Sequence, residues 1–210
     1  MIGVLDYGIG NLASAYKALV KVGGDAKLIA SSESLDGFDG LVLPGVGAFG
    51  SCVNAIREVG FDKLIMSAVE KEIPFLGICI GMQVLFENSQ EDPLAEGLGL
   101  FKGSIEKITG DVKLPQMQWN ELDFEKGRTS ELLKGIGAQP WVYFVHSYAA
   151  VPDTNRDLDL KVVATCQYGN EVVAMVEKNQ IYGVQFHPEK SGKVGLKLLS
   201  NFVELCEANS

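Results

Sequence analysis

The stretch GICIGMQ, residues 77–83, places a cysteine between two glycines, directly after the apolar run IPFL and before residues that can form a helix. A nucleophile at a strand-to-helix junction is typical of an elbow, in which a strained turn pushes the side chain out above a sheet. Gly77 and Gly81 would let neighbouring backbone approach that turn closely. We therefore predict that Cys79 is presented as a nucleophile at the end of a strand.

The residues before this bend predict an α/β fold. Short apolar runs, typical of buried strands, occupy residues 2–6, 26–30, 40–45 and 73–79. Helical patterns lie between them, at residues 12–22 and, with a break near Gly60, at residues 51–72. Strands that alternate with helices pair in parallel through right-handed crossovers. We expect a doubly wound, mostly parallel sheet with helices on both faces.

The second half of the chain shows a different pattern. From about residue 89 to residue 140, the turn signals EDP, TGD, EKGRTS and KGIGAQP separate short strands, which predicts an antiparallel annex. Residues 141–187 are rich in strand formers, and a final helix is expected from near Ser191. No segment reads as a linker, and a chain of 210 residues fits one compact unit. We expect a single domain over residues 1–210.

The composition argues against several classes of protein. The opening residues MIGVLDYGIG lack the basic start and long apolar middle of a signal peptide, and no stretch approaches the roughly eighteen apolar residues of a membrane span. The four cysteines contain no CxxC pair, so neither a zinc site nor a disulfide framework is indicated. The net charge of −9, without a basic cluster, argues against nucleic acid. We expect a cytoplasmic protein.

Two physical effects would activate Cys79. The amide dipoles of a following helix favour a thiolate, and a nearby imidazole can accept the thiol proton. The alternative is a small buried cysteine with packing glycines, which is the commoner case for the pattern GxCxG alone. A second signal is therefore needed.

The second signal comes from one of the two histidines. His187 lies in QFHPEKS, where Glu189 follows two residues later and Pro188 is expected to keep the chain extended, so that both side chains point the same way. This pattern suits a carboxylate that orients an imidazole, which would take the proton of Cys79 and later protonate the leaving group. Alone, HPE is more often an exposed loop. His146, inside the apolar run YFVHSY, is expected to be a hydrogen-bonded structural residue.

The segment PGVGAFG, residues 44–50, supplies the third element. In the elbow architecture one oxyanion-hole amide follows the nucleophile and another comes from the loop after a neighbouring strand. The amide of Ile80 and that of Val46 or Gly47 are the candidates. Without Cys79 and His187, a simple strand-to-helix turn would be the better interpretation.

Cys79, His187 and Glu189, in this chain order, resemble the catalytic triad of the class I glutamine amidotransferases. The likeness extends to the glutamine amidotransferase subunits of imidazole glycerol phosphate synthases. The segments that carry it are DYGIGNLASAYKAL, LPGVGAFG, GICIGMQ, WN at residues 119–120, YFVHSY and GVQFHPEKS. It therefore runs from the first predicted strand to the last helix.

The resemblance implies a role for each matching residue. Cys79 attacks the side-chain amide of glutamine, His187 is the acid and base, and Glu189 orients it. The residues that match the glutamine pocket are Gly47, Gln83, Ser147 and Tyr148. The residues that match the face toward a cyclase subunit, a (β/α)8 barrel, are Asn11, Trp119, Asn120 and Lys190. Simpler roles stay open: an N-cap for Asn11, a core aromatic for Trp119 and a solvated charge for Lys190.

The segment PQMQWN, residues 115–120, departs from the resemblance, which implies PHMGWN. Gln116 and Gln118 stand where a histidine and a glycine are expected. Neither belongs to the triad, so the departure concerns the partner contact. An amide at Gln118, next to Trp119, would fill room in which glycine lets a partner's backbone approach.

The resemblance implies a glutaminase subunit that hydrolyses glutamine to glutamate and ammonia. It passes the ammonia, within a heterodimer, to a cyclase that makes imidazole glycerol phosphate for histidine biosynthesis, and no metal or organic cofactor is implied. An amidotransferase for the anthranilate or pyridoxal phosphate pathway would share the triad, but DYGIGN and WN argue against it. A cysteine peptidase or related hydrolase would not release glutamate from free glutamine. A binding subunit without activity would not need the triad.

Overall fold

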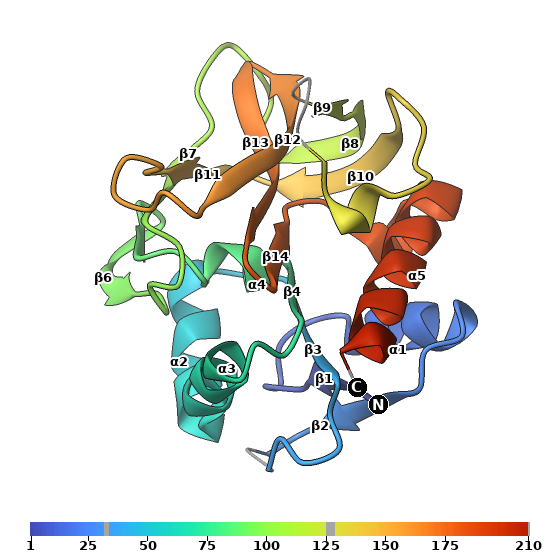
Figure 1. Ribbon diagram of the computed structural model, residues 1–210. Coiled ribbons are helices and arrows are strands. Elements are labelled where there is room, and N and C mark those ends of the chain that lie inside the picture. The colour runs from blue at the N-terminus through green and yellow to red at the C-terminus, as the bar shows by residue number, and fades with distance from the viewer. Residues whose placement is uncertain (32–33, 125–128, 210) are drawn as a thin grey trace.

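The predicted strands form one central sheet (Figure 1). The computed structural model describes residues 1–31, 34–124 and 129–209. Its eight-stranded sheet has the order β2-β1-β3-β4-β14-β13-β12-β9. In that order the strands span Ala26–Ile29, Ile2–Leu5, Gly40–Gly45, Phe75–Cys79, Ile181–Val184, Asn170–Lys178, Lys161–Tyr168 and Asp123–Phe124. Neighbours among the first five pair in parallel, and the remaining pairs are antiparallel. The expected doubly wound, mostly parallel sheet is confirmed.

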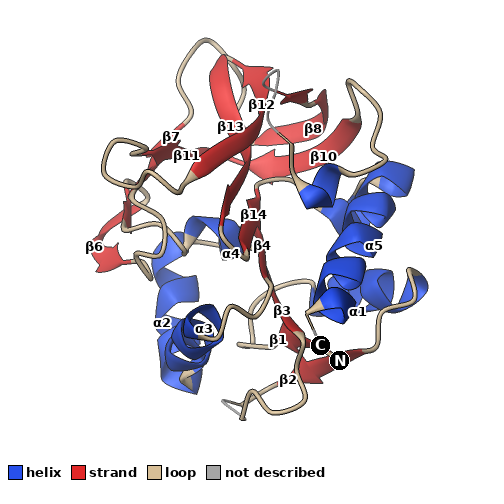
Figure 2. Cartoon of the chain, viewed as in Figure 1, coloured by secondary structure: helices blue, strands red, loops and turns tan. Residues whose placement is uncertain are grey.

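Helices cover both faces of the parallel strands (Figure 2). On one face lie α1 and α5, and on the other lie α2 and α3, with bounds Leu12–Lys21, Gly192–Ala208, Phe49–Val59 and Phe61–Glu70. The break predicted near Gly60 is present, because Gly60 has a φ of +81° and separates α2 from α3. Within the described ranges, no helix combines the length and the apolar character needed to cross a membrane.

Side-chain alternation along the strands explains this two-sided arrangement. Leu41 and Leu43 of β3 pack into the buried cluster that contains α2 and α3. Val42, between them, packs into the cluster that contains α1 and α5. Successive side chains of a strand point to opposite faces of a sheet, so an unbroken apolar strand builds both cores at once.

The expected annex is present as two smaller sheets. One has the order β11-β7-β5-β6, with bounds Tyr148–Pro152, Gly103–Lys107, Asn88–Ser89 and Asp92–Glu96. The other pairs β10, Trp141–His146, with β8, Gln116–Glu121, and a 3-10 helix at Glu131–Leu133 precedes β10. The pairing is antiparallel except between β5 and β7, and β9 joins the central sheet instead. Of the turn expected at residues 125–130, residues 125–128 lie outside the described residues.

The chain passes from one of these two sheets to the other at Ser147. β10 ends at His146 and pairs with β8, whereas β11 begins at Tyr148 and pairs with β7. The carbonyl of Ser147 accepts a hydrogen bond from the amide of Ile108 at 3.0 Å, which fixes the crossing. This crossing passes beside the end of β4, where Cys79 Sγ lies 3.8 Å from the carbonyl oxygen of Val145. The two small sheets therefore form one wall of whatever site lies above β4.

The parallel strands bring the predicted site residues to one edge. The carboxyl ends of β3 and β4 lie together, with Gly45 in register beside Cys79. β14 pairs in parallel with the other side of β4 and ends at Val184, three residues before His187. Ligands of open α/β sheets bind outside the carboxyl ends of the strands, and this is the edge at which the candidate site lies.

Candidate active site

Cys79 lies at a sharp backbone bend. Its φ is +56° and its ψ is −112°, in a region that residues with side chains rarely adopt. A side chain at Gly77 would come within 2.5 Å of the carbonyl oxygen of Gly81, and one at Gly81 would collide with the carbonyl of Leu43. The expectation that both glycines allow close backbone approach is confirmed. The helix after the bend, α4, spans only Ile80–Gln83, so its dipole is that of a single turn.

His187 and Glu189 form a buried pair. His187 Nδ1 lies 2.9 Å from Glu189 Oε1, and the two side chains are 3% and 4% exposed. The expectation that Pro188 keeps the chain extended is wrong, because Pro188–Lys190 form a turn of 3-10 helix. Ser191 stabilises this turn, since its hydroxyl donates to the carbonyl of His187 at 2.6 Å and accepts the amide N–H of Tyr143 at 3.0 Å.

The surroundings of His187 favour its charged form. Burial alone would lower the pKa of the imidazole, but Cys79 and the Glu189 carboxylate outweigh burial and raise that pKa to about 9. Nε2 is buried and makes no hydrogen bond of ordinary geometry to the residues that the structure describes. Nδ1 is held by Glu189, so Nε2 is the atom available to exchange a proton with Cys79 or a ligand.

His146 is buried and hydrogen-bonded, as predicted. It is 6% exposed, and its Nδ1 donates to the carbonyl of Tyr148 at 2.8 Å. Burial is the main cause that lowers the pKa of this imidazole to about 4, so the ring is neutral near pH 7. With a pKa of about 4, this ring holds a proton too weakly to form the charged pair that the surroundings of His187 favour.

Backbone N–H groups are available beside Cys79. The amides of Val46 and Gly47, in the loop after β3, make no hydrogen bond to any residue in the described part of the chain. Gly47 has a φ of +114°, a conformation that favours glycine. The loop that carries Val46 follows Gly45, the register partner of Cys79. An unpaired N–H group at this edge can serve a ligand oxygen.

The loop of residues 45–47, named the oxyanion loop after its predicted role, is tightly packed on its other side. A side chain at Gly45 would collide with the Tyr7 hydroxyl and with the side chain of Ile80. The carbonyl of Val46 accepts a hydrogen bond from the Cys52 thiol at 3.7 Å. Burial is the main cause that raises the pKa of Cys52 to about 11, so the thiol keeps its proton and remains a donor.

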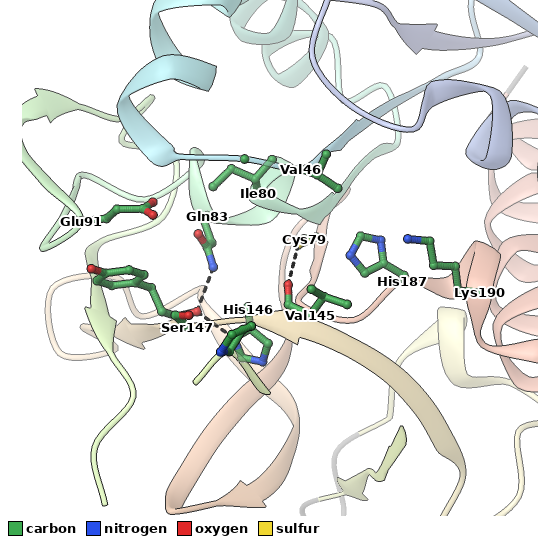
Figure 3. Close-up of a pocket in the computed structure, with 13 residues that line it drawn as sticks. Val46, Cys79, Ile80, Gln83, Glu91, Val145, His146, Ser147, His187 and Lys190 are labelled. Atoms are coloured by element: carbon green, nitrogen blue, oxygen red, sulfur yellow. Dashed lines mark hydrogen bonds between the residues drawn. The ribbon is translucent and has the colours of Figure 1, made fainter. Parts of the chain in front are cut away.

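A cavity of about 250 Å³ lies over Cys79 (Figure 3). The predicted site residues that line it are Val46, Gly47, Cys79, Ile80, Gln83, Ser147, Tyr148, His187 and Lys190. Glu189 lies behind His187 and outside the lining. The amide nitrogen of Gln83 donates to the carbonyl of Tyr148 at 2.9 Å and to Gln185 Oε1 at 2.8 Å. Among the described residues, no group of His, Cys, Asp and Glu is arranged to hold a metal ion.

Sequence reasoning missed two polar residues of the site. Glu91 lines the cavity, and its Oε2 accepts the amide N–H of Phe49 at the start of α2, at 2.8 Å. Gln185 is fully buried, and its Nε2 lies 3.7 Å from Cys79 Sγ. A signal existed for Gln185, because it lies two residues before His187 in an apolar run. No local signal marked Glu91.

The residues predicted for a partner face have different environments. Trp119 is 45% exposed and makes an edge contact with the Tyr143 ring, so it is not a core aromatic. Lys190 is exposed at the cavity, and Asn11 stands at the N-cap position of α1 without a side-chain capping bond. The Asn120 amide donates to the carbonyl of Gln167 at 3.0 Å, so it already has a partner within the chain.

The two glutamines that depart from the resemblance do not crowd Trp119. Gln116 is fully buried, with its Nε2 3.8 Å from Cys166 Sγ. Gln118 precedes Trp119 in β8, and adjacent residues of a strand point to opposite faces. Gln118 is exposed, and the expectation that its amide fills room for a partner's backbone stays a prediction.

Comparison with known proteins decides the family. The sequence matches the family "Glutamine amidotransferase class-I" over residues 3–206. The chain belongs to the class-I glutamine amidotransferases. A relative of this amidotransferase, "Imidazole glycerol phosphate synthase subunit HisH" of Caldanaerobacter subterraneus subsp. tengcongensis, is 44% identical over 205 residues, 98% of each chain. The protein of the same description from Synechococcus sp. (strain JA-3-3Ab) is 47% identical over 97% of this chain and 93% of its own.

Solved structures share the fold of this amidotransferase. A structure described as "Crystal structure of glutamine amidotransferase" matches with a TM-score of 0.75 at 22% identity, over 98% of both chains. PurLQS from Thermotoga maritima matches with a TM-score of 0.77 at 22% identity, over 97% of both chains. The central sheet and its helices therefore have the same fold as these two solved structures.

We expect Cys79→Ser to lower glutamine hydrolysis by roughly a thousand-fold or more, because a hydroxyl is far less acidic than a thiol. The melting temperature should hardly change, since the side chains are nearly isosteric. A glutamine-analogue electrophile should label Cys79, which lines the cavity, and spare Cys52, Cys166 and Cys206, which are at most 1% exposed. Peptide mass spectrometry measures the labelling. Equal modification of all four cysteines would remove Cys79 from this role.

The rate of glutamine hydrolysis should fall as the pH rises through about 9, the pKa of His187. Above that pH the imidazole loses the proton that the departing nitrogen needs. His187→Asn should remove most of the activity, whereas His146→Asn should first lower the melting temperature. A rate that stays level well above this pH, or the reverse behaviour of the two variants, would show that the base is misassigned.

Proposed function

We propose that this amidotransferase is the glutaminase subunit of an imidazole glycerol phosphate synthase, acting in histidine biosynthesis. One observation carries the proposal: a cysteine on a strained bend, a histidine–carboxylate pair and unpaired backbone N–H groups meet at one cavity. Identity of 44% and 47% to proteins described as subunit HisH supports this acceptor over the anthranilate or pyridoxal phosphate pathway.

The first half-reaction releases ammonia. The thiolate of Cys79 adds to the side-chain carbonyl carbon of glutamine, and the oxyanion takes N–H donors from Ile80 and from Val46 or Gly47. The imidazolium of His187 gives its Nε2 proton to the amide nitrogen. The C–N bond then breaks, which leaves ammonia and a γ-glutamyl thioester on Cys79.

The second half-reaction restores the enzyme. Neutral His187 takes a proton from water as the water oxygen adds to the thioester carbonyl. The C–S bond breaks, and Cys79 and His187 return to the thiolate and the imidazolium. The γ-carboxyl group of the product releases its proton to water, and glutamate leaves. Throughout, the Glu189 carboxylate accepts a hydrogen bond from the Nδ1–H group of His187 and so keeps Nε2 directed at the reacting atoms.

The cavity offers complementary groups for the remainder of glutamine. The carboxylate of Glu91 faces the site as a counter-charge for the α-ammonium group. Gln83, Ser147 and Tyr148 line the same cavity and provide neutral polar groups. A volume of about 250 Å³ suits a small amino acid rather than a peptide, which argues against a peptidase.

The product explains the need for a partner. In neutral water ammonia becomes ammonium, which has no lone pair for attack, so ammonia needs a sheltered path to the cyclase. An apolar face starts at the cavity wall, where Val145 lies in register with Met117 and Tyr143 with Trp119 on the β8–β10 ribbon. Met117 and Trp141 are 61% and 54% exposed. Such a contiguous apolar surface is typical of an interaction site, and we assign it to the cyclase barrel.

Control of the reaction should lie in the oxyanion loop. Gly45 and Gly47 make two orientations of the intervening peptides accessible, and the Cys52 thiol holds the Val46 carbonyl in the present one. Loss of one preorganised donor costs about a hundred- to a thousand-fold in rate. A subunit that hydrolysed glutamine without its acceptor would waste both products.

We expect little glutamate from the chain alone, and stimulation of roughly a hundred-fold or more when the cyclase and its nucleotide ligand are both present. The measurement is glutamate release at saturating glutamine, for the chain alone, with cyclase, and with cyclase plus ligand. Equal turnover in all three conditions would contradict control by the oxyanion loop. No glutamate in any of them would contradict the proposed function itself.

Trp119→Ala should weaken assembly with the cyclase by about 2 kcal/mol, roughly thirty-fold in Kd, because a large half-exposed aromatic at an interface centre is a typical hot spot. Isothermal titration calorimetry measures the affinity. Leu158→Ala is the matched control, since Leu158 is 86% exposed on a loop away from the cavity. Equal affinities for the two variants, with the fold verified, would place the cyclase elsewhere.

A further inference from the structure

A continuous chain of buried amides connects the cavity wall to the sulfur of Cys79. The Gln83 amide nitrogen donates to the carbonyl of Tyr148 at 2.9 Å and to Gln185 Oε1 at 2.8 Å. The Gln185 amide nitrogen lies 3.7 Å from Cys79 Sγ. Gln185 is fully buried and Gln83 is 4% exposed, so water does not compete for these contacts. A buried polar group without a hydrogen-bond partner destabilises the fold, and here the amide groups of Gln83 and Gln185 have such partners.

The carbonyl of Tyr148 fixes the direction of the whole chain. A backbone carbonyl only accepts, so the Gln83 atom that faces it must be the amide nitrogen. The second proton of that nitrogen requires an acceptor, so the Gln185 atom that faces Gln83 must be the oxygen. The atom of Gln185 that faces Cys79 is therefore its nitrogen, an N–H donor.

A donor aimed at sulfur distinguishes the two protonation states of Cys79. The thiol can direct its proton to the carbonyl of Val145, 3.8 Å away, and gains little from a further donor. The thiolate has no proton to donate to that carbonyl oxygen, so its stability depends on N–H groups that donate hydrogen bonds to the sulfur. Hydrogen bonds to an ionised group are about twice as strong as neutral ones. Gln185 thus favours the thiolate, and the proton that leaves Sγ goes to His187 Nε2.

We propose that Gln185 is a further catalytic residue, whose side-chain N–H stabilises the Cys79 thiolate and holds the sulfur toward the cavity. Gln83 acts through it as a positioning residue, because its bond to Oε1 keeps the nitrogen of Gln185 on the sulfur side. This inference rests on the proposed role of Cys79 as the nucleophile.

The test is the rate of Cys79 alkylation by iodoacetamide as a function of pH, followed by peptide mass spectrometry. Gln185→Leu removes the donor at similar volume. We expect the midpoint of the pH–rate profile to move up by about one pH unit, which slows alkylation below the midpoint about ten-fold. Gln185→Glu keeps an oxygen toward Gln83 but places negative charge beside the sulfur, so its midpoint should move further. In both variants kcat for glutamine should fall more than KM rises.

Gln116→Leu is the matched control. Gln116 is also fully buried and also contacts a cysteine, with its Nε2 3.8 Å from Cys166 Sγ. This variant should lose stability as Gln185→Leu does, yet keep the wild-type alkylation profile. Unchanged midpoints in both Gln185 variants would overturn the inference, and so would a shift of equal size in Gln116→Leu.

The same measurement separates this inference from the proposed function. Alkylation of Cys79 needs neither glutamine nor cyclase, so a shifted midpoint supports the role of Gln185 toward the thiolate even in a preparation that releases no glutamate. If the wild-type complex hydrolyses glutamine and the midpoints do not move, the proposed function stands and the inference fails.

Discussion

The backbone conformation of Cys79 is the constraint on which the site depends. A φ of +56° with a ψ of −112° costs a residue with a side chain about 1–3 kcal/mol, so the surroundings must enforce it. Gly77 and Gly81 allow the backbone on either side of the bend to pack closely, because neither position has room for a Cβ. β4 is also held between β3 and β14 in parallel register. The bend turns the sulfur away from the strand and into the cavity, where the loop after β3 and the turn after β14 already lie.

The burial of the histidine–carboxylate pair then determines how its charges behave. His187 and Glu189 are almost fully buried, and a buried charge is stable only when it is paired and hydrogen-bonded. The imidazolium has the Glu189 carboxylate on one side and Cys79 on the other, which is why its pKa rises to about 9 although burial opposes this. The same exclusion of water strengthens each donor toward the sulfur or an oxyanion. The strained backbone thus positions the sulfur of Cys79 beside the same imidazole that the charge pair stabilises.

The sequence was most informative where a signal was local. The bend at GICIGMQ, the pair His187 and Glu189, and the alternation of strands and helices are encoded within short stretches, and each was predicted. Glu91 was missed because its place at the site depends on how the annex packs against α2, 42 residues from its partner Phe49. The geometry at Pro188 was mispredicted, since proline also suits the first position of a helical turn. The role of Gln185 could not be predicted, because it depends on a chain of hydrogen bonds between three separate segments of the sequence.

The central claim is that glutamine is cleaved through a covalent bond to Cys79, and trapping that intermediate tests it most directly. The complex with cyclase and nucleotide ligand is mixed with glutamine, quenched in acid during the first turnover, digested and analysed by mass spectrometry. The account predicts a γ-glutamyl thioester on the peptide that contains Cys79, formed no more slowly than ammonia and lost as glutamate appears. Turnover without an adduct at Cys79, or an adduct on Cys52, Cys166 or Cys206 that forms and decays at the rate of turnover, would contradict it.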